Sequence, residues 1–269
     1  MKNTMMTALA AGAFLLGPSQ SEAALFSYYI GVDGLQTIAS GEFAGAANPN
    51  ANRLTLLYAH PDEVTPASSH YHSKGIYRYQ PGSASSPVIE VSPSSYLPEG
   101  TNPPLAMTAG SGIYAGKSVV LEDPANHFSL IDFKSTADLD GFTAGTTENY
   151  LFNSSAARWT GSIADADVHL VLVSMTPGLN IGTETSLFSG LINPGDELHL
   201  GSDIDFSPVF WLDGDAAGGA YTADFKLVDE SGTFGDSGTF QFRFNAVPEP
   251  STTLLGASAL MLALIRRRR

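Results

Sequence analysis

Three of the six histidines of the chain lie within one short segment, AHPDEVTPASSHYHSKG, at residues 59–75. His70 and His72 are two positions apart, so on an extended strand their side chains project from the same face. His60 ends the apolar segment RLTLLY-AH, and a polar, proline-containing loop separates it from the pair. Two strands joined by this loop would return the pair to His60. Because neutral imidazole is a ligand for Zn, Cu, Ni or Fe, the spacing predicts a metal site, with zinc favoured.

The fourth ligand of such a site is open at the level of sequence. His169 begins the apolar segment VHLVLVSM and is the preferred candidate, because a strand would hold it rigidly. The alternatives are His127, Asp62, Glu63 and a water molecule. His199 is expected to be structural. The simplest competing interpretation is a surface loop with exposed histidines and no metal.

Other chemistry has weaker support, and the chain is predicted not to be an enzyme. The cupin motif needs a glutamate three or four residues after His-x-His, where this chain has Gly75 and Ile76. The GDSG segment at 235–238 matches a fragment of a serine protease motif but is typical of a hairpin turn. The aspartate pairs at 203 and 205 and at 213 and 215 lack the full spacing of a calcium loop.

Both ends of the chain have the patterns of targeting segments. Residues 1–23 combine Lys2, an apolar stretch and a small-x-small cleavage site, which predicts a secretory signal peptide processed by signal peptidase. Residues 247–269 hold VPEPS, a short apolar stretch and four arginines. This tail resembles the PEP-CTERM sorting tail that exosortase recognises. The resemblance implies a Gram-negative bacterium with exopolysaccharide, transient anchoring in the inner membrane by a short transmembrane helix, and a final place in the periplasm, outer surface or extracellular matrix.

Residues 24–246 are predicted to form an all-β core, a single jelly-roll-like β-sandwich, because short alternating apolar segments are separated by clusters of turn residues. The segment TFQFRF shows this alternation well. Residues 44–52 and 80–104 are expected to be surface loops, and 135–139 and 147–152 short helices. The predicted strands cover residues 25–30, 53–58, 75–79, 88–91, 128–133, 168–175, 197–200, 209–211, 221–229 and 238–244.

Composition narrows the possible partners. The net charge of −14 argues against nucleic acid and attracts cations. The absence of cysteine excludes disulfides and thiolate metal ligands. The chain is long enough to bury a core that does not need such cross-links.

The segments LTLLYAHP, SSHYHSKGIYRY, VHLVLVSMTPGLNIG and FSPVFWLDGDAAGGAYTADFKLVDESGTFGDSGTFQFRF, together with the tail, resemble the PEP-CTERM proteins repressed by the zinc-uptake regulator. The resemblance implies expression under zinc limitation and the binding of Zn²⁺ outside the cytoplasm for scavenging, storage or delivery, for example to a zinc importer. The positions that it implies as ligands are His60, His70, His72 and His169, with His127 as an alternative. The competing prediction is a structural protein of the surface or exopolysaccharide matrix. A cupin-like metalloenzyme is a more remote alternative.

Overall fold

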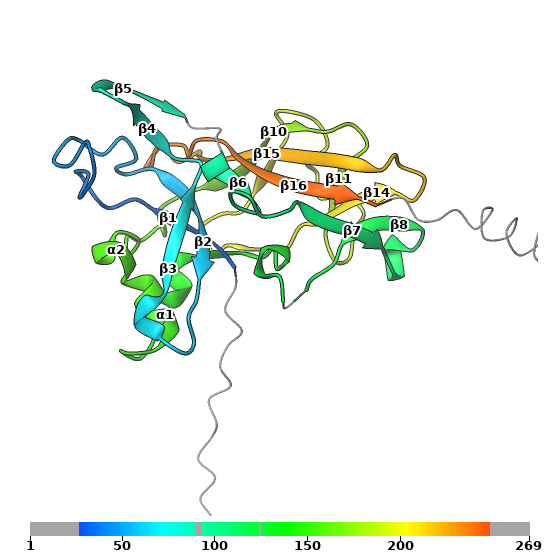
Figure 1. Ribbon diagram of the computed structural model, residues 1–269, viewed down its shortest axis with the longest axis horizontal. Coiled ribbons are helices and arrows are strands. Elements are labelled where there is room, and N and C mark those ends of the chain that lie inside the picture. The colour runs from blue at the N-terminus through cyan, green and yellow to red at the C-terminus, as the bar shows by residue number, and fades with distance from the viewer. Residues whose placement is uncertain (1–26, 90–92, 124, 248–269) are drawn as a thin grey trace, which may run out of the picture.

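The structure, a computed structural model, describes residues 27–89, 93–123 and 125–247 (Figure 1). A five-stranded sheet has the order β13-β9-β1-β2-β3. Its strands are β1 (Tyr28–Val32), β2 (Leu54–His60), β3 (His70–Lys74), β9 (Phe133–Ser135) and β13 (Asp205–Phe206). The hairpin of β2 and β3 forms one side of this sheet, so β3 is an edge strand.

The larger sheet contains nine strands, with β15 and β16 as its long central pair. In their order across the sheet, eight of the strands are β11 (Asn180–Gly182), β14 (Val209–Asp213), β8 (Lys117–Val120), β7 (Leu105–Ala109), β16 (Phe240–Ala246), β15 (Gly219–Asp229), β10 (Val168–Met175) and β12 (Glu197–His199). β6 (Tyr96–Leu97) pairs with β16, and β4 (Tyr77–Gln80) and β5 (Ser83–Ile89) form a separate hairpin. The helices α1 (Thr147–Phe152) and α2 (Ser154–Ala157) lie beside β3 in Figure 1. Five short 3-10 turns complete the fold: η1 (Pro66–Ser68), η2 (Pro93–Ser95), η3 (Gly112–Tyr114), η4 (His127–Ser129) and η5 (Thr136–Leu139).

Both sheets contribute side chains to one apolar core. Alternate residues of β16, Phe240, Phe242 and Phe244, are fully buried, as expected for a strand with one face in the core. Tyr28 on β1 packs against Phe242 with ring centroids 5.6 Å apart, so the two sheets meet here. Full burial of each aromatic side chain contributes about 1.5–3 kcal/mol, which makes this core the main source of stability.

The other face of the five-stranded sheet is buried as well. Tyr29, Leu57 and Tyr71 pack with Leu151 of α1 and with Trp159 in a second apolar cluster. β2 is therefore buried on both sides, and six of its seven residues are buried, with His60 as the half-buried end. The metal-ligand candidate His60 is thus the last residue of a strand that is buried on both faces.

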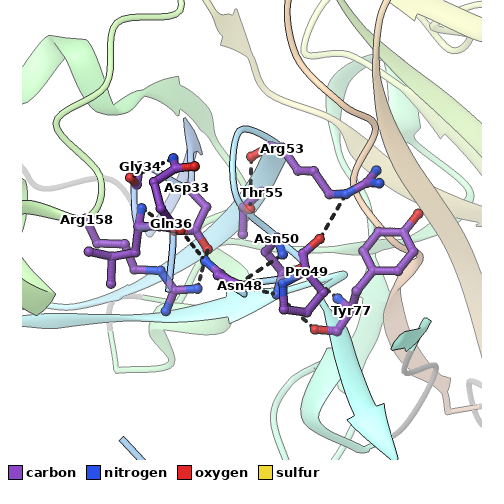
Figure 2. Close-up of polar contacts among 11 residues, drawn as sticks. Asp33, Gly34, Gln36, Asn48, Pro49, Asn50, Arg53, Thr55, Tyr77 and Arg158 are labelled. Atoms are coloured by element: carbon purple, nitrogen blue, oxygen red, sulfur yellow. Dashed lines mark hydrogen bonds and ion pairs between the residues drawn. The ribbon is translucent and has the colours of Figure 1, made fainter. Parts of the chain in front are cut away.

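A buried polar network fixes the connection between β1 and β2, as Figure 2 shows. Asp33, which is fully buried, forms an ion pair with Arg158, and Asn48 donates a hydrogen bond of 2.9 Å to its Oδ2 atom. Asn50 also donates to the carbonyl oxygen of Tyr77 at 2.9 Å. The predicted loop at 44–52 is thereby held in one conformation, and it leads into β2 in a fixed place.

The all-β prediction is confirmed, and β10 has the predicted bounds, 168–175. The jelly-roll arrangement stays a prediction. The predicted strand at 128–133 is wrong for most of its length, because residues 127–129 form η4 and β9 begins only at Phe133. The predicted strand at 75–79 begins too early, since Gly75 has a positive φ of 64° and separates β3 from β4.

Residues 80–104 are not a plain surface loop. They contain β5, η2 and β6, and Leu97 of β6 is fully buried. The serine and proline content predicts a loop, but the segment also contains β6, which packs in the core through Leu97. The predicted signal peptide, the first residues of the predicted core (24–26) and the predicted tail after Val247 lie outside the described residues. Within the described ranges, no helix has the length and apolar character needed to cross a membrane.

Candidate metal centre

The β2–β3 hairpin brings the three clustered histidines together. The antiparallel register places His60 opposite His70 and Tyr58 opposite His72. Residues opposite each other in an antiparallel pair share a face, and so do residues two apart on one strand. All three imidazoles therefore lie on the face that carries Tyr58, beyond the edge of the core. Their ring centroids are 4.2 Å apart for His60 and His72, and 5.0 Å apart for His70 and His72.

The Nδ1 atoms of the β3 histidines both face acceptors. His70 Nδ1 lies 2.8 Å from the carbonyl oxygen of Ser68. His72 Nδ1 lies 2.7 Å from Oε2 of Glu99. A carbonyl oxygen and a carboxylate only accept hydrogen bonds, so each Nδ1 carries a proton. In the neutral form of both rings, the Nε2 atoms then hold the lone pairs that bind metals.

Those two Nε2 atoms face each other at a separation of 3.1 Å. Two lone pairs at this distance repel unless a proton or a metal ion lies between them. Tetrahedral zinc with Zn–N bonds of about 2.0–2.1 Å holds its nitrogen ligands about 3.4 Å apart. His60 Nε2 is buried and makes no hydrogen bond, which leaves it available as a third ligand. His70 and His72 are thus placed to share a zinc ion, and His60, whose ring centroid is 5.4 Å from that of His70 and 4.2 Å from that of His72, is the nearest candidate for a third ligand.

Glu99 completes the cluster from a segment 27 positions after His72. Its Oε2 atom is 3.6 Å from His60 Nε2, and its Oε1 atom is 2.6 Å from the buried Lys74 Nζ. Desolvation alone would raise the pKa of Glu99, but its contacts with His60, Lys74 and His72 outweigh this effect and lower the pKa to about 2. Glu99 is therefore a carboxylate at neutral pH. Ligand atoms of His60, His72 and Glu99 all lie within 4.8 Å of one another.

Lys74 belongs to the same face of the hairpin, because it pairs with Leu56 two positions before Tyr58. Its ammonium also donates a hydrogen bond of 2.7 Å to the carbonyl oxygen of Ser94. Burial lowers the pKa of Lys74, and the contact with Glu99 opposes this shift. The ion pair holds Glu99 in place against His72.

The structure narrows the choice of a fourth ligand. His127, on η4, lines the same two cavities as His60, of about 450 and 480 Å³. Glu63 lines the larger of the two. Asp62 has a role in its turn, where Oδ1 accepts hydrogen bonds from the backbone of Val64 and Thr65 at 3.0 and 2.7 Å.

His169 does not join this cluster. It lies on β10 of the larger sheet, opposite His199 on β12, with ring centroids 5.1 Å apart. Asp167 and Glu230 surround it instead, each with a carboxylate oxygen 3.5 Å from His169 Nε2. The fourth ligand inferred from sequence thus belongs to a separate group of ionisable side chains, and so does His199.

Sequence reasoning missed Glu99, and no local pattern marks it. It follows the buried β6 and reaches the hairpin only through the tertiary fold. Two of the four aspartates named as weak calcium candidates pair with lysines: Lys117 Nζ is 2.9 Å from Asp213 Oδ1, and Lys134 contacts Asp205.

Comparison with known proteins identifies no relative of this chain. No protein-family model matches the chain, and searches of the curated proteins and of the solved structures find no similar protein. The functional argument therefore depends on the residues and their geometry.

Proposed function

We propose that this protein is an exported zinc-binding protein that holds Zn²⁺ through Nε2 of His60, His70 and His72. The observation that carries the proposal is the 3.1 Å approach of the His70 and His72 Nε2 atoms, while both Nδ1 atoms face acceptors. Glu99 orients His72, as carboxylates commonly do for metal-bound histidines. The fourth position is taken by His127 or by water.

The exposure of the cluster favours a zinc ion that exchanges with the surroundings. The side chains of His60 and His72 are 37% and 40% exposed, and His70 is exposed. Structural zinc sites are closed by four protein ligands, whereas a site with an open position admits an incoming ligand. Scavenging or delivery of zinc therefore fits this site better than a structural role for the ion.

Export and sorting follow from the end segments and stay part of the proposal. A signal peptide and an exosortase tail would place the site outside the cytoplasm, where the resemblance to zinc-repressed PEP-CTERM proteins also puts it. Partners there would be a zinc importer or exopolysaccharide. A matrix protein with incidental histidines is the alternative that the binding experiment has to exclude.

The test is a zinc titration of the purified full chain near pH 7, followed by dialysis and metal analysis. His70→Ala combined with His72→Ala should remove one tightly bound zinc per chain, because only His60 would remain. His199→Ala, a histidine outside the cluster, should leave the affinity of this site unchanged. Binding should weaken below about pH 6, where imidazoles protonate.

If the native chain holds no zinc after dialysis, the matrix interpretation gains support. If the double variant retains as many zinc ions as the native chain, at the same affinity, the assignment to His70 and His72 is wrong. If iron is retained with turnover of an organic substrate, a cupin-like enzyme replaces the binding protein.

A further inference from the structure

We propose a second site for a divalent transition-metal ion, formed by Asp167, His169, His199 and Glu230 on the larger sheet. It shares no residue with the His60 cluster and does not depend on the function proposed above. The expected ion is one that accepts mixed imidazole and carboxylate ligands, with Zn²⁺ as the probe.

Strand geometry brings these side chains to one face. Asp167 and His169 are two positions apart, and so are Glu197 and His199 on the neighbouring strand. His169 lies opposite His199 on β12 and opposite Val228 on β15. Glu230 follows Val228 by two positions, and its backbone N–H donates to the carbonyl oxygen of Asp167 at 2.9 Å. Because side chains alternate across a strand, all of them point away from the core that holds Val168 and Leu170.

His169 is buried without a hydrogen-bond partner, which is an independent sign of a ligand at this group. Only 8% of its surface is exposed, and neither ring nitrogen makes a hydrogen bond. A buried polar group without a hydrogen bond destabilises the fold, so such a group calls for a ligand. Carboxylate oxygens lie around the ring without bonding to it, so the imidazole points into the middle of the group.

The distances suit a metal ion at Nε2. Asp167 Oδ1 and Glu230 Oε2 are each 3.5 Å from His169 Nε2. His199 Nε2 lies 2.8 Å from Asp167 Oδ1, a direct contact that would lengthen when both atoms bind one ion. Ligands of a tetrahedral ion with bonds of about 2.0–2.2 Å are separated by about 3.3–3.6 Å. Glu197 lies across the ring, 4.0 Å from Nδ1, where it can orient the imidazole.

The local charge also favours a cation. Asp167, Glu197 and Glu230 bring three carboxylates to two imidazoles. Lys226 is on the same face, opposite Val171, but its ammonium lies 3.4 Å from Asp236 Oδ2. A divalent ion would reduce the repulsion among the acids and would tie the short edge strand β12 to β10 and to the turn after β15.

The test uses the full chain carrying His70→Ala and His72→Ala, so that only the second site can hold zinc. After dialysis against zinc, metal analysis should find one ion per chain, and zinc should raise the melting temperature by several degrees. Adding Asp167→Asn and Glu230→Gln should reduce the retained ion to none and abolish the shift. These two carboxylates are 44% and 47% exposed, so replacing them should not prevent folding. Adding Asp165→Asn, an exposed acid on the same segment, should change neither result.

A parallel variant, His169→Ala with His199→Ala in the otherwise native chain, should lose one of two ions and keep the first at its original affinity. If the His70/His72 variant retains no zinc, or retains it despite loss of Asp167 and Glu230, the group is an ion-pair network without a metal, and the inference is overturned. A third outcome separates the two proposals. If replacing His70 and His72 does not change the number of bound ions, while replacing Asp167 and Glu230 removes the only ion, the second site is supported and the proposed function at the His60 cluster is wrong.

Discussion

Glu99 decides how the candidate zinc ligands are held. It contacts His72 and His60 and is itself fixed by the buried Lys74. A carboxylate that accepts the Nδ1 proton of a histidine fixes the orientation of the ring and raises the basicity of Nε2. The sequence predicts the pair His70 and His72 from spacing alone. It cannot predict Glu99, because the contact spans 27 positions and depends on the position of β6 in the fold.

Glu99→Gln should lower zinc affinity roughly 10- to 100-fold, the usual effect of losing such an orienting carboxylate. The amide keeps the size of the side chain but loses its charge, so the fold should remain. Competition with a zinc chelator measures the change. Glu184→Gln, at an exposed site, is the matched control and should have no effect. Equal affinities for the two variants would remove Glu99 from the site.

The acid stability of the metal-free chain should also depend on Glu99. Its pKa of about 2 in the folded protein is below the ordinary 4.5, so the carboxylate contributes stability at pH values above about 4.5. That contribution is lost as the pH falls from about 4.5 to about 2. Urea unfolding in the presence of chelator, repeated across this range, should show a pH-dependent loss that is smaller in Glu99→Gln. An identical pH dependence in both proteins would contradict the assignment.

At the level of elements, the β2–β3 hairpin is what places the site. The apolar segment ending at His60 and the His-x-His pair together predict this hairpin, because a polar loop separates two segments that can pair. The sheet to which it belongs, and the burial of both its faces, come from long-range contacts of Tyr29 and Trp159 that the local pattern does not contain. Likewise, Asp167-x-His169 and Glu197-x-His199 are visible as two acid-x-His motifs, but only the register of β10 and β12 shows that they face each other.

Asp33→Ala should destabilise the fold by about 3 kcal/mol, because it breaks a buried ion pair and removes an acceptor from Asn48. Chemical denaturation measures this change in the free energy of unfolding. Asp213→Asn is the matched control: its pair with Lys117 is on the surface, the Asp213 side chain is 67% exposed, and the loss should be below about 1 kcal/mol. Similar losses in the two variants would mean that the network in Figure 2 does not support β1 and β2.

Across the whole molecule, the six histidines gather at two places. His60, His70 and His72 form one cluster, with His127 lining the same cavities as His60, and His169 and His199 form the other. A net charge of −14 surrounds both with a potential that attracts cations. The core, in contrast, consists of aromatic and aliphatic side chains from both sheets, so the fold should persist when zinc is removed.

The most direct test of zinc binding at the hairpin is anomalous diffraction at the zinc edge from crystals of the zinc-loaded protein. We expect a strong anomalous peak about 2 Å from Nε2 of both His70 and His72, with His60 Nε2 as a third ligand. An absence of signal there, with zinc found only at other side chains such as Asp203 or Asp213, would contradict the proposed function.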